Sequence, residues 1–147
     1  LMDQTPEQIL SKSLVAENKL NKLIDEVKEK YNLKANEIII GGFSQGCMIT
    51  LQTGIKRKDT INSIVGYSGR IISTEHLSKN LVSRPNIILM HGDLDQVVPI
   101  ESLLEAKEFF GKNNYEIETK IFKDCEHRIP TEGSSLGLQF IKKHFDL

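Results

Sequence analysis

Hydrophobic and polar positions along the chain follow two spacings, one typical of helices and the other of buried strands. Residues 6–31 place apolar side chains at helical spacing on one face and lysine or glutamate on the other. Thr5, Pro6 and Gln8 supply an N-cap, a first-turn proline and a capping-box partner. The pattern therefore predicts a helix over this range, most easily broken near Ser11–Ser13.

Short β-branched runs then alternate with segments of helical character. Ile38–Ile40, stopped by Gly41-Gly42, is typical of a strand covered on both faces. Further strands are expected at 61–67, 86–90 and 115–122, and further helices at 47–56, 101–110 (ended by Gly111) and 131–145. This alternation predicts right-handed βαβ units and an α/β fold, with a mainly parallel sheet flanked by helices. No linker, repeat or low-complexity tract interrupts it, so residues 1–147 are expected to form a single domain.

Composition argues against several classes of function. The 147 residues are 39% hydrophobic and 27% charged, and the formal net charge of −1 gives no reason to expect nucleic acid as a partner. No apolar run approaches the roughly 20 residues of a membrane span, so no stable membrane insertion is expected. Cys47 and Cys125 are too few for a disulfide framework, which makes the cytoplasm the expected compartment.

Residues 42–46 carry the strongest chemical signal in the chain. Gly42-Phe43-Ser44-Gln45-Gly46 matches G-x-S-x-G and lies between a predicted strand and a predicted helix. A serine on such a sharp turn holds a strained backbone and presents its hydroxyl at the tip of the sheet. The backbone N–H of Gln45 begins the helix, where it can donate to an oxyanion. Ser44 is therefore the candidate nucleophile, and a chance turn is the alternative.

A serine nucleophile needs a base, and the base needs a carboxylate that orients it. On this type of sheet the chain order is Ser, then Asp or Glu, then His. Asp95 follows the third predicted strand and His127 follows the last one. Both therefore emerge at the same edge of the sheet as Ser44, which predicts a Ser44-Asp95-His127 triad.

The other acids and histidines near these positions have simpler explanations. Asp93 is the competing acid, but its Gly-Asp context is typical of a turn. His91 precedes the acid in sequence, which is the wrong order for the base. His144 complements the dipole of the last helix, and His76 is expected to be solvated on a polar stretch.

With these motifs in place, the sequence resembles the acyl-protein thioesterase, phospholipase and carboxylesterase family of α/β hydrolases. The resemblance rests on GGFSQG at residues 41–46, on HGDLDQVVP at 91–99 and on His127 before the final helix. It implies a serine hydrolase that cleaves carboxylic esters or thioesters through an acyl-enzyme. Ser44 would be the nucleophile, Asp95 the acid and His127 the base, and no metal or cofactor is implied.

The chain departs from the family pattern in two places. Cys47 stands where members usually have another glycine, and we expect it to pack under the helix. Residues 1–36 contain nothing like the H-G-x-G loop that supplies the second oxyanion donor, so the resemblance implies an α/β-hydrolase domain truncated at its N-terminus. Loss of one donor typically costs roughly 10²–10³ in rate. The strand at 38–42 would also expose an unpaired edge, which favours a homo-oligomer.

Residues around the triad indicate an acyl substrate without setting its length. Phe43 and Val98 are apolar positions near the site, and Ser68 is expected to line the cleft unless it simply forms a turn. Activity should fall as His127 becomes protonated, because only the neutral imidazole can act as a base.

Three alternatives remain open at the level of sequence. The chain could be a catalytically impaired remnant or a self-associating interaction module of the same fold. A dienelactone-hydrolase-like enzyme would usually carry cysteine where this chain has Ser44. A flavodoxin-like binding protein would share the alternation of strands and helices, but it would not need Ser, Asp and His at successive strand ends.

Overall fold

A four-stranded parallel sheet, in the order β1-β2-β3-β4, forms the centre of the computed structural model, which describes residues 3–145. The strands are β1 (Ile39–Phe43), β2 (Ser63–Tyr67), β3 (Asn86–Gly92) and β4 (Ile117–Phe122). Because all four run in the same direction, their C-terminal ends meet at one edge of the sheet.

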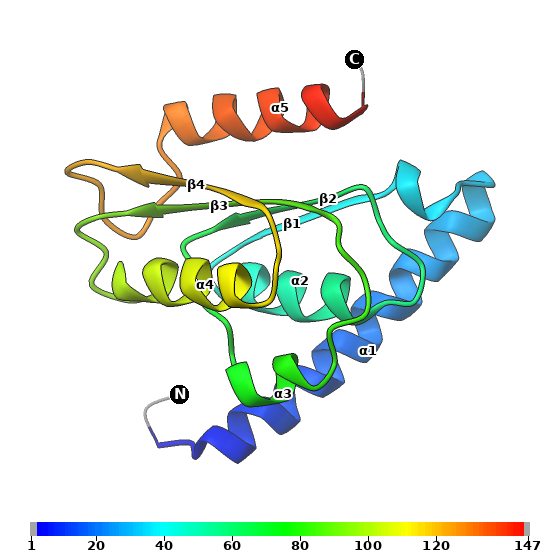
Figure 1. Cartoon of the computed structure of the whole chain (residues 1–147), viewed down its shortest axis with the longest axis horizontal. Coiled ribbons are helices and arrows are strands. Elements are labelled where there is room, and N and C mark those ends of the chain that lie inside the picture. Colours follow the sequence, from blue (N-terminus) through cyan, green and yellow to red (C-terminus); the bar gives the residue numbers. More distant parts are fainter. Residues whose placement is uncertain (1–2, 146–147) are drawn as a thin grey trace.

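Helices cover both faces of this sheet (Figure 1). They are α1 (Pro6–Tyr31), α2 (Gln45–Lys56), α3 (Thr74–Ser78), α4 (Glu101–Lys112) and α5 (Thr131–Phe145), with a 3₁₀ turn at Ala35–Glu37. The α2 and α4 helices lie on one face and α5 lies on the other, while α1 packs against α2 rather than on the sheet. The structure is therefore layered, with α1 as an additional outer layer.

Successive residues of the central strands point to opposite faces, which explains their continuously apolar sequences. Ile64, Ile87 and Leu89 belong to a core cluster that includes side chains of α2 and α4. Val65, Ile88 and Met90 belong to a second cluster with Phe122 and with Phe140 of α5. Both faces of β2 and β3 are thus buried. The sequence predicted this for the strand at 38–40, but Ile39 and Ile40 of β1 are only half-buried, because β1 has a neighbouring strand on one side alone among the described residues.

The α1 helix begins as predicted but is not broken. The Thr5 hydroxyl accepts a hydrogen bond from the Gln8 N–H at 3.1 Å, and the Gln8 side chain accepts one from the Thr5 N–H at 2.9 Å. Helical structure continues past Ser13, whose hydroxyl donates to the Leu10 carbonyl and accepts from the Gln52 side chain. Because these contacts satisfy the serine within the helix, it does not interrupt α1.

Two expectations about glycine were wrong. Gly41 and Gly42 continue β1 instead of stopping it, and they pair in register with Val65 and Gly66. Gly111 lies inside α4, which extends to Lys112. At β1 the glycines serve close packing against neighbouring elements, and they do not form a turn.

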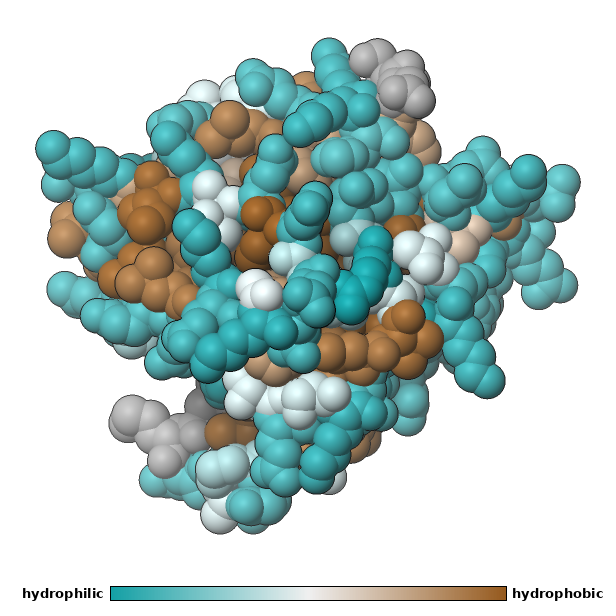
Figure 2. Space-filling view, viewed as in Figure 1, coloured by the Kyte–Doolittle hydropathy of each residue, from teal (hydrophilic) through white to brown (hydrophobic). Residues whose placement is uncertain are grey.

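The surface seen in Figure 2 is largely hydrophilic, with apolar side chains in separate patches. None of the helices within residues 3–145 combines the length and the apolar character that crossing a membrane requires.

Charged side chains tie α1 to the segment after α2. Arg57 donates to Asp59 at 2.8 Å and to Asp25 of α1 at 2.7 Å, and Lys28 of α1 also pairs with Asp59. The hydrogen bond from Arg57 lowers the pKa of Asp59 to about 2, against an opposing effect of burial and with further help from Lys28. Ionised Asp59 therefore stabilises the folded state.

We expect Asp59→Asn to lower the free energy of unfolding by about 1 kcal/mol at neutral pH. Because the folded-state pKa is depressed, this contribution is present above the ordinary value of 3.8 and is lost as the pH falls toward 2. Urea unfolding of the variant and the wild type should therefore converge across that acid range. Glu105→Gln, at an exposed carboxylate, is the control; a difference independent of pH would contradict the assignment.

The outer edge of β1 leads to a second prediction. Within the four-stranded sheet of the described residues, β1 pairs with β2 on one side and with no strand on the other. An unpaired strand edge is a template for another chain. We expect light scattering coupled to gel filtration to give a mass that rises with protein concentration. A monomeric mass at every concentration would contradict self-association through residues 38–42.

Candidate active site

Ser44 occupies a strained backbone conformation between β1 and α2, in the sharp turn at residues 42–46 that we call the elbow. Its φ of 58° and ψ of −119° lie outside the regions that non-glycine residues normally adopt. The Ser44 N–H donates to the Tyr67 carbonyl at 2.8 Å, and the Ser44 carbonyl accepts from the Met48 N–H at 3.1 Å. These bonds fix the turn and place the side chain at the C-terminal edge of the sheet.

Gly42 is required at this turn on steric grounds. A Cβ atom there would lie 2.3 Å from the Gly46 carbonyl carbon and 2.7 Å from the Cys47 nitrogen. Gly46 is different, because a Cβ at that position would meet nothing within 4 Å. Only the first glycine of the motif is therefore required by packing.

The structure brings the three predicted triad residues together. His127 Nε2 lies 3.0 Å from Ser44 Oγ, and His127 Nδ1 lies 2.7 Å from Asp95 Oδ2. Ser44 follows β1, Asp95 follows β3 and His127 follows β4, so the three come from separate loops at one sheet edge. The Asp95 side chain is fully buried, whereas that of His127 remains 18% exposed.

Asp95 is held as a carboxylate by its hydrogen bonds. Its Oδ1 accepts from the N–H groups of Val97 and Val98 at 2.9 and 2.8 Å, and its Oδ2 faces His127. Burial by itself would raise the pKa of Asp95, but the bonds from His127, Val98 and Val97 outweigh it, and the pKa lies below its ordinary value.

His91 supports this arrangement, although the sequence did not assign it a role. It is buried at the end of β3, and its Nε2 lies 2.8 Å from the Val98 carbonyl. Since a carbonyl only accepts, this nitrogen carries the hydrogen, and it also lies 3.5 Å from Asp95 Oδ2. His91 thus braces the loop that presents Asp95. Its position four residues before Asp95 was the available signal.

The other acid and histidines considered in the sequence make structural contacts outside the triad. The Asp93 carboxylate accepts from the Cys125 N–H at 3.3 Å and so joins the loop of Asp95 to that of His127. The His144 ring packs against Phe140 in the last turn of α5. His76 is half-buried on α3, 2.8 Å from Lys56 Nζ, so the expectation that it is solvated was wrong. Burial, together with the charge of Lys56, lowers the pKa of His76.

Four further residues were expected near the triad, and they differ in accessibility. The rings of Phe43 and His127 lie 4.7 Å apart, and Phe43 is 37% exposed. Gln45 is exposed as the first residue of α2. Val98 is buried but lines the cavity beside Ser44. Ser68 is only 2% exposed and does not line that cavity; its N–H donates to the Met90 carbonyl.

The cavity beside Ser44 has a volume of about 670 Å³. It is bounded by the start of α1, the start of α2 and the loops that follow β2 and β3. Its lining residues are Gln4, Ile9, Lys12, Ser13, Ala16, Ser44, Gln45, Gly46, Met48, Ile49, Arg70, Ile72, Val97 and Val98. An elongated, largely apolar molecule could therefore approach the Ser44 hydroxyl from this side.

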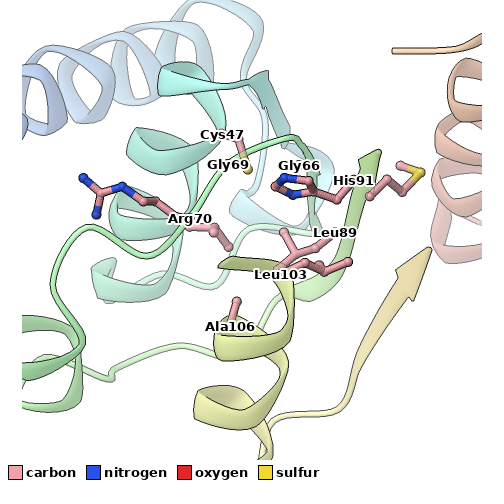
Figure 3. Close-up of a pocket in the computed structure, with 10 residues that line it drawn as sticks. Cys47, Gly66, Gly69, Arg70, Leu89, His91, Leu103 and Ala106 are labelled. Atoms are coloured by element: carbon pink, nitrogen blue, oxygen red, sulfur yellow. The ribbon is translucent and has the colours of Figure 1, made fainter. Parts of the chain in front are cut away.

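Cys47 lies beneath the elbow and is inert as a nucleophile. Its side chain is buried beside Gly66 and Gly69, where an added Cβ atom would lie 2.6 Å from the Cys47 sulfur (Figure 3). Burial raises the pKa of this thiol to about 12, so it stays protonated at neutral pH. The void beside it is only about 10 Å³. Cys47 therefore packs under the helix, as the sequence predicted.

Among residues 3–145, no three His, Cys, Asp or Glu side chains are grouped to hold a metal ion.

The chain is similar in sequence to several known proteins. A family model described as Phospholipase/Carboxylesterase matches residues 2–146. Acyl-protein thioesterase 1 of Saccharomyces cerevisiae is 37% identical over 137 residues, which cover 86% of this chain and 59% of that protein. Acyl-protein thioesterase 1 homolog 1 of Dictyostelium discoideum is 31% identical over 143 residues, covering 96% and 62%. The chain thus spans about three fifths of the length of these curated relatives.

Solved structures show the same architecture. The crystal structure of esterase PE8 matches with a TM-score of 0.91 and 26% identity, over 98% of this chain and 67% of that chain. Arabidopsis thaliana SOBER1 matches with a TM-score of 0.81 over 96% and 66%, but at 19% identity this likeness concerns the fold alone. The predicted fold class, a mainly parallel sheet flanked by helices, is confirmed.

The asymmetry between the two elbow glycines can be tested directly. Gly42→Ala should lower the free energy of unfolding by roughly 1–3 kcal/mol, because the methyl group collides with backbone atoms that cannot rotate away. Gly46→Ala places its methyl group in open space and serves as the matched control, with unchanged or slightly increased stability. Equal destabilisation of both variants in urea unfolding would refute the steric account.

Proposed function

The chain belongs to the phospholipase/carboxylesterase family, and from that premise we propose that it is a serine hydrolase of carboxylic esters or thioesters. Ser44 is the nucleophile, His127 the general base and Asp95 the acid that orients the base. The observation that carries the proposal is the continuous hydrogen-bonded path from Ser44 through His127 to Asp95, with steps of 3.0 and 2.7 Å.

Each side chain has a defined part in the proposed acylation step. His127 Nε2 accepts the hydroxyl proton as Ser44 Oγ attacks the carbonyl carbon of the substrate. Asp95 holds the proton on His127 Nδ1 and stabilises the imidazolium that forms, which its low pKa favours. The imidazolium then protonates the departing alcohol or thiol, leaving the acyl group on Ser44. Water, activated by the same base, releases the acid and restores the hydroxyl.

Charge on the tetrahedral intermediate requires hydrogen-bond donors near Ser44. The N–H of Gln45 is the first of α2, and the first N–H groups of a helix have no partner within it. The positive end of the helix dipole adds to its effect. Most of the described segment before β1 is taken up by α1, so it presents no H-G-x-G loop as a second donor. We therefore expect turnover by this chain to be slow.

Thioesters are included because two curated relatives carry the name acyl-protein thioesterase. A thiolate is a better leaving group than an alkoxide, so it departs more readily in the acylation step. Deacylation is the same for both substrates, because each leaves its acyl group on Ser44.

A second candidate function is an interaction module that keeps the triad without efficient catalysis. It is favoured by the edge of β1 that pairs with no strand among residues 3–145. Assembly through that edge would then be the function, and Ser44 would be dispensable for it.

Labelling with a fluorophosphonate probe, followed by hydrolysis of a p-nitrophenyl ester, tests the proposal. We expect Ser44 to be labelled, and Ser44→Ala to lose both labelling and turnover. Asp95→Asn should lower the rate by roughly 10³–10⁴-fold, because it removes the group that sets the imidazole tautomer.

Glu105→Gln is the matched control, since Glu105 is an exposed carboxylate on α4 that does not line the cavity beside Ser44. It should label and turn over close to wild type. Labelling without turnover would indicate an activated serine with a defective oxyanion hole. A folded sample that is not labelled at all would contradict the hydrolase proposal and leave the interaction module.

A further inference from the structure

The cavity beside Ser44 combines apolar walls with positive charge. Ile9, Ala16, Met48, Ile49 and Ile72 supply half-buried apolar surface along it. Among residues 3–145, the charged side chains that line it are Lys12 and Arg70, and both are cationic. Such a lining suits a molecule with an apolar chain and an anionic group, because the charge would meet donors without a competing carboxylate.

Of these two cations, Arg70 is the better placed to bind an anion. It follows β2 and Gly69 in the loop beneath the elbow, and an added Cβ atom on Gly69 would lie 3.2 Å from the Ser44 carbonyl. The chain at Gly69 therefore passes close to the Ser44 backbone, and Arg70 lines the same cavity as Ser44. Its guanidinium extends away from the apolar side chains of the small cavity (Figure 3).

The guanidinium of Arg70 retains most of its hydrogen-bonding capacity. Its two hydrogen bonds, to the carbonyls of Ile71 and Ile72, are long, at 3.3 and 3.4 Å. Within residues 3–145 no Asp or Glu forms an ion pair with it. This contrasts with Arg57, which binds two aspartates. A half-buried arginine without a carboxylate partner can take a bidentate anion.

Negative charge gathers on the other side of the Asp95 loop. A separate cavity of about 380 Å³ there is lined by Asp93, Asp95, Glu101 and Glu126. The loop thus divides an acidic side from a cationic side, and Ser44 opens onto the cationic one. An anionic substrate is attracted to the side where the nucleophile lies and is repelled from the other.

We propose that Arg70, assisted by Lys12, selects ester or thioester substrates that carry a carboxylate or phosphate on the acyl chain. The chain would lie along Met48, Ile49 and Ile72, with its anionic group at the guanidinium and its carbonyl at Ser44. This inference rests on the proposed hydrolase function, since it names the class of substrate that the same site takes.

Binding can be measured without catalysis. We would titrate octyl phosphate and uncharged octanol into the Ser44→Ala protein by calorimetry. Octyl phosphate should bind, and adding Arg70→Gln should weaken it roughly tenfold, whereas octanol should be unaffected. Arg70→Lys should restore part of the affinity. Lys58→Gln, at an exposed lysine outside the cavity, is the matched control and should change nothing.

Kinetics supplies the second measurement. The ratio of kcat/KM for p-nitrophenyl hydrogen glutarate to that for p-nitrophenyl valerate isolates the terminal carboxylate. It should exceed one in the wild type and fall roughly tenfold in Arg70→Gln. Lys12→Gln should reduce it less, because Lys12 is exposed.

The two proposals fail in different ways. If neither ester is hydrolysed, the hydrolase proposal fails while the calorimetric comparison still decides the anion site. If valerate is hydrolysed with no preference for the anionic ester, and octyl phosphate binds Arg70→Gln as well as it binds the parent, the role of Arg70 is overturned. Thermal unfolding of Arg70→Gln and Arg70→Lys distinguishes lost recognition from lost folding.

Discussion

The close approach of β1 to the first turn of α2 is the constraint on which the rest of the structure depends. Gly42 lets the strand come within van der Waals reach of the Gly46 carbonyl, and Ser44 absorbs the resulting turn in a strained conformation. The strain is balanced by the hydrogen bond from the Ser44 N–H to the Tyr67 carbonyl and by burial of β2 and β3 on both faces. A flexible loop at this position would leave the hydroxyl without a fixed direction.

The parallel arrangement of the strands brings Ser44, Asp95 and His127 together. Because β1, β3 and β4 end at the same edge, three loops that are distant in sequence meet there. Two further hydrogen bonds hold these loops in position: the Asp93 carboxylate accepts from the Cys125 N–H, and His91 Nε2 donates to the Val98 carbonyl. Asp95 is consequently buried with its acceptors filled, which keeps it charged beside His127.

Charge is distributed unevenly around this assembly. Carboxylates lie on one side of the Asp95 loop, whereas Arg70 and Lys12 lie on the side to which Ser44 opens. The chemistry of a triad is shared by many substrates, so the lining of the adjacent cavity determines which of them can bind. The half-buried apolar residues of that lining, and an Arg70 guanidinium without a carboxylate partner in residues 3–145, are the basis for proposing an amphiphilic, anionic acyl chain as substrate.

The sequence by itself determined the order of the four strands and of the four longer helices, and it located Ser44, Asp95 and His127 at three strand ends, because apolar periodicity and strand-end placement are local properties. It could not determine that Gly41 and Gly42 extend β1, since that depends on how close α2 comes. The roles of His91 and Arg70 likewise depend on residues that are distant from them or that only the fold brings close. His91 contacts Val98 and Asp95, and Arg70 lines the cavity beside Ser44. The short α3 helix and the contact of His76 with Lys56 also arise from packing between segments. Local patterns specify which elements form, and tertiary packing decides which side chains share a site.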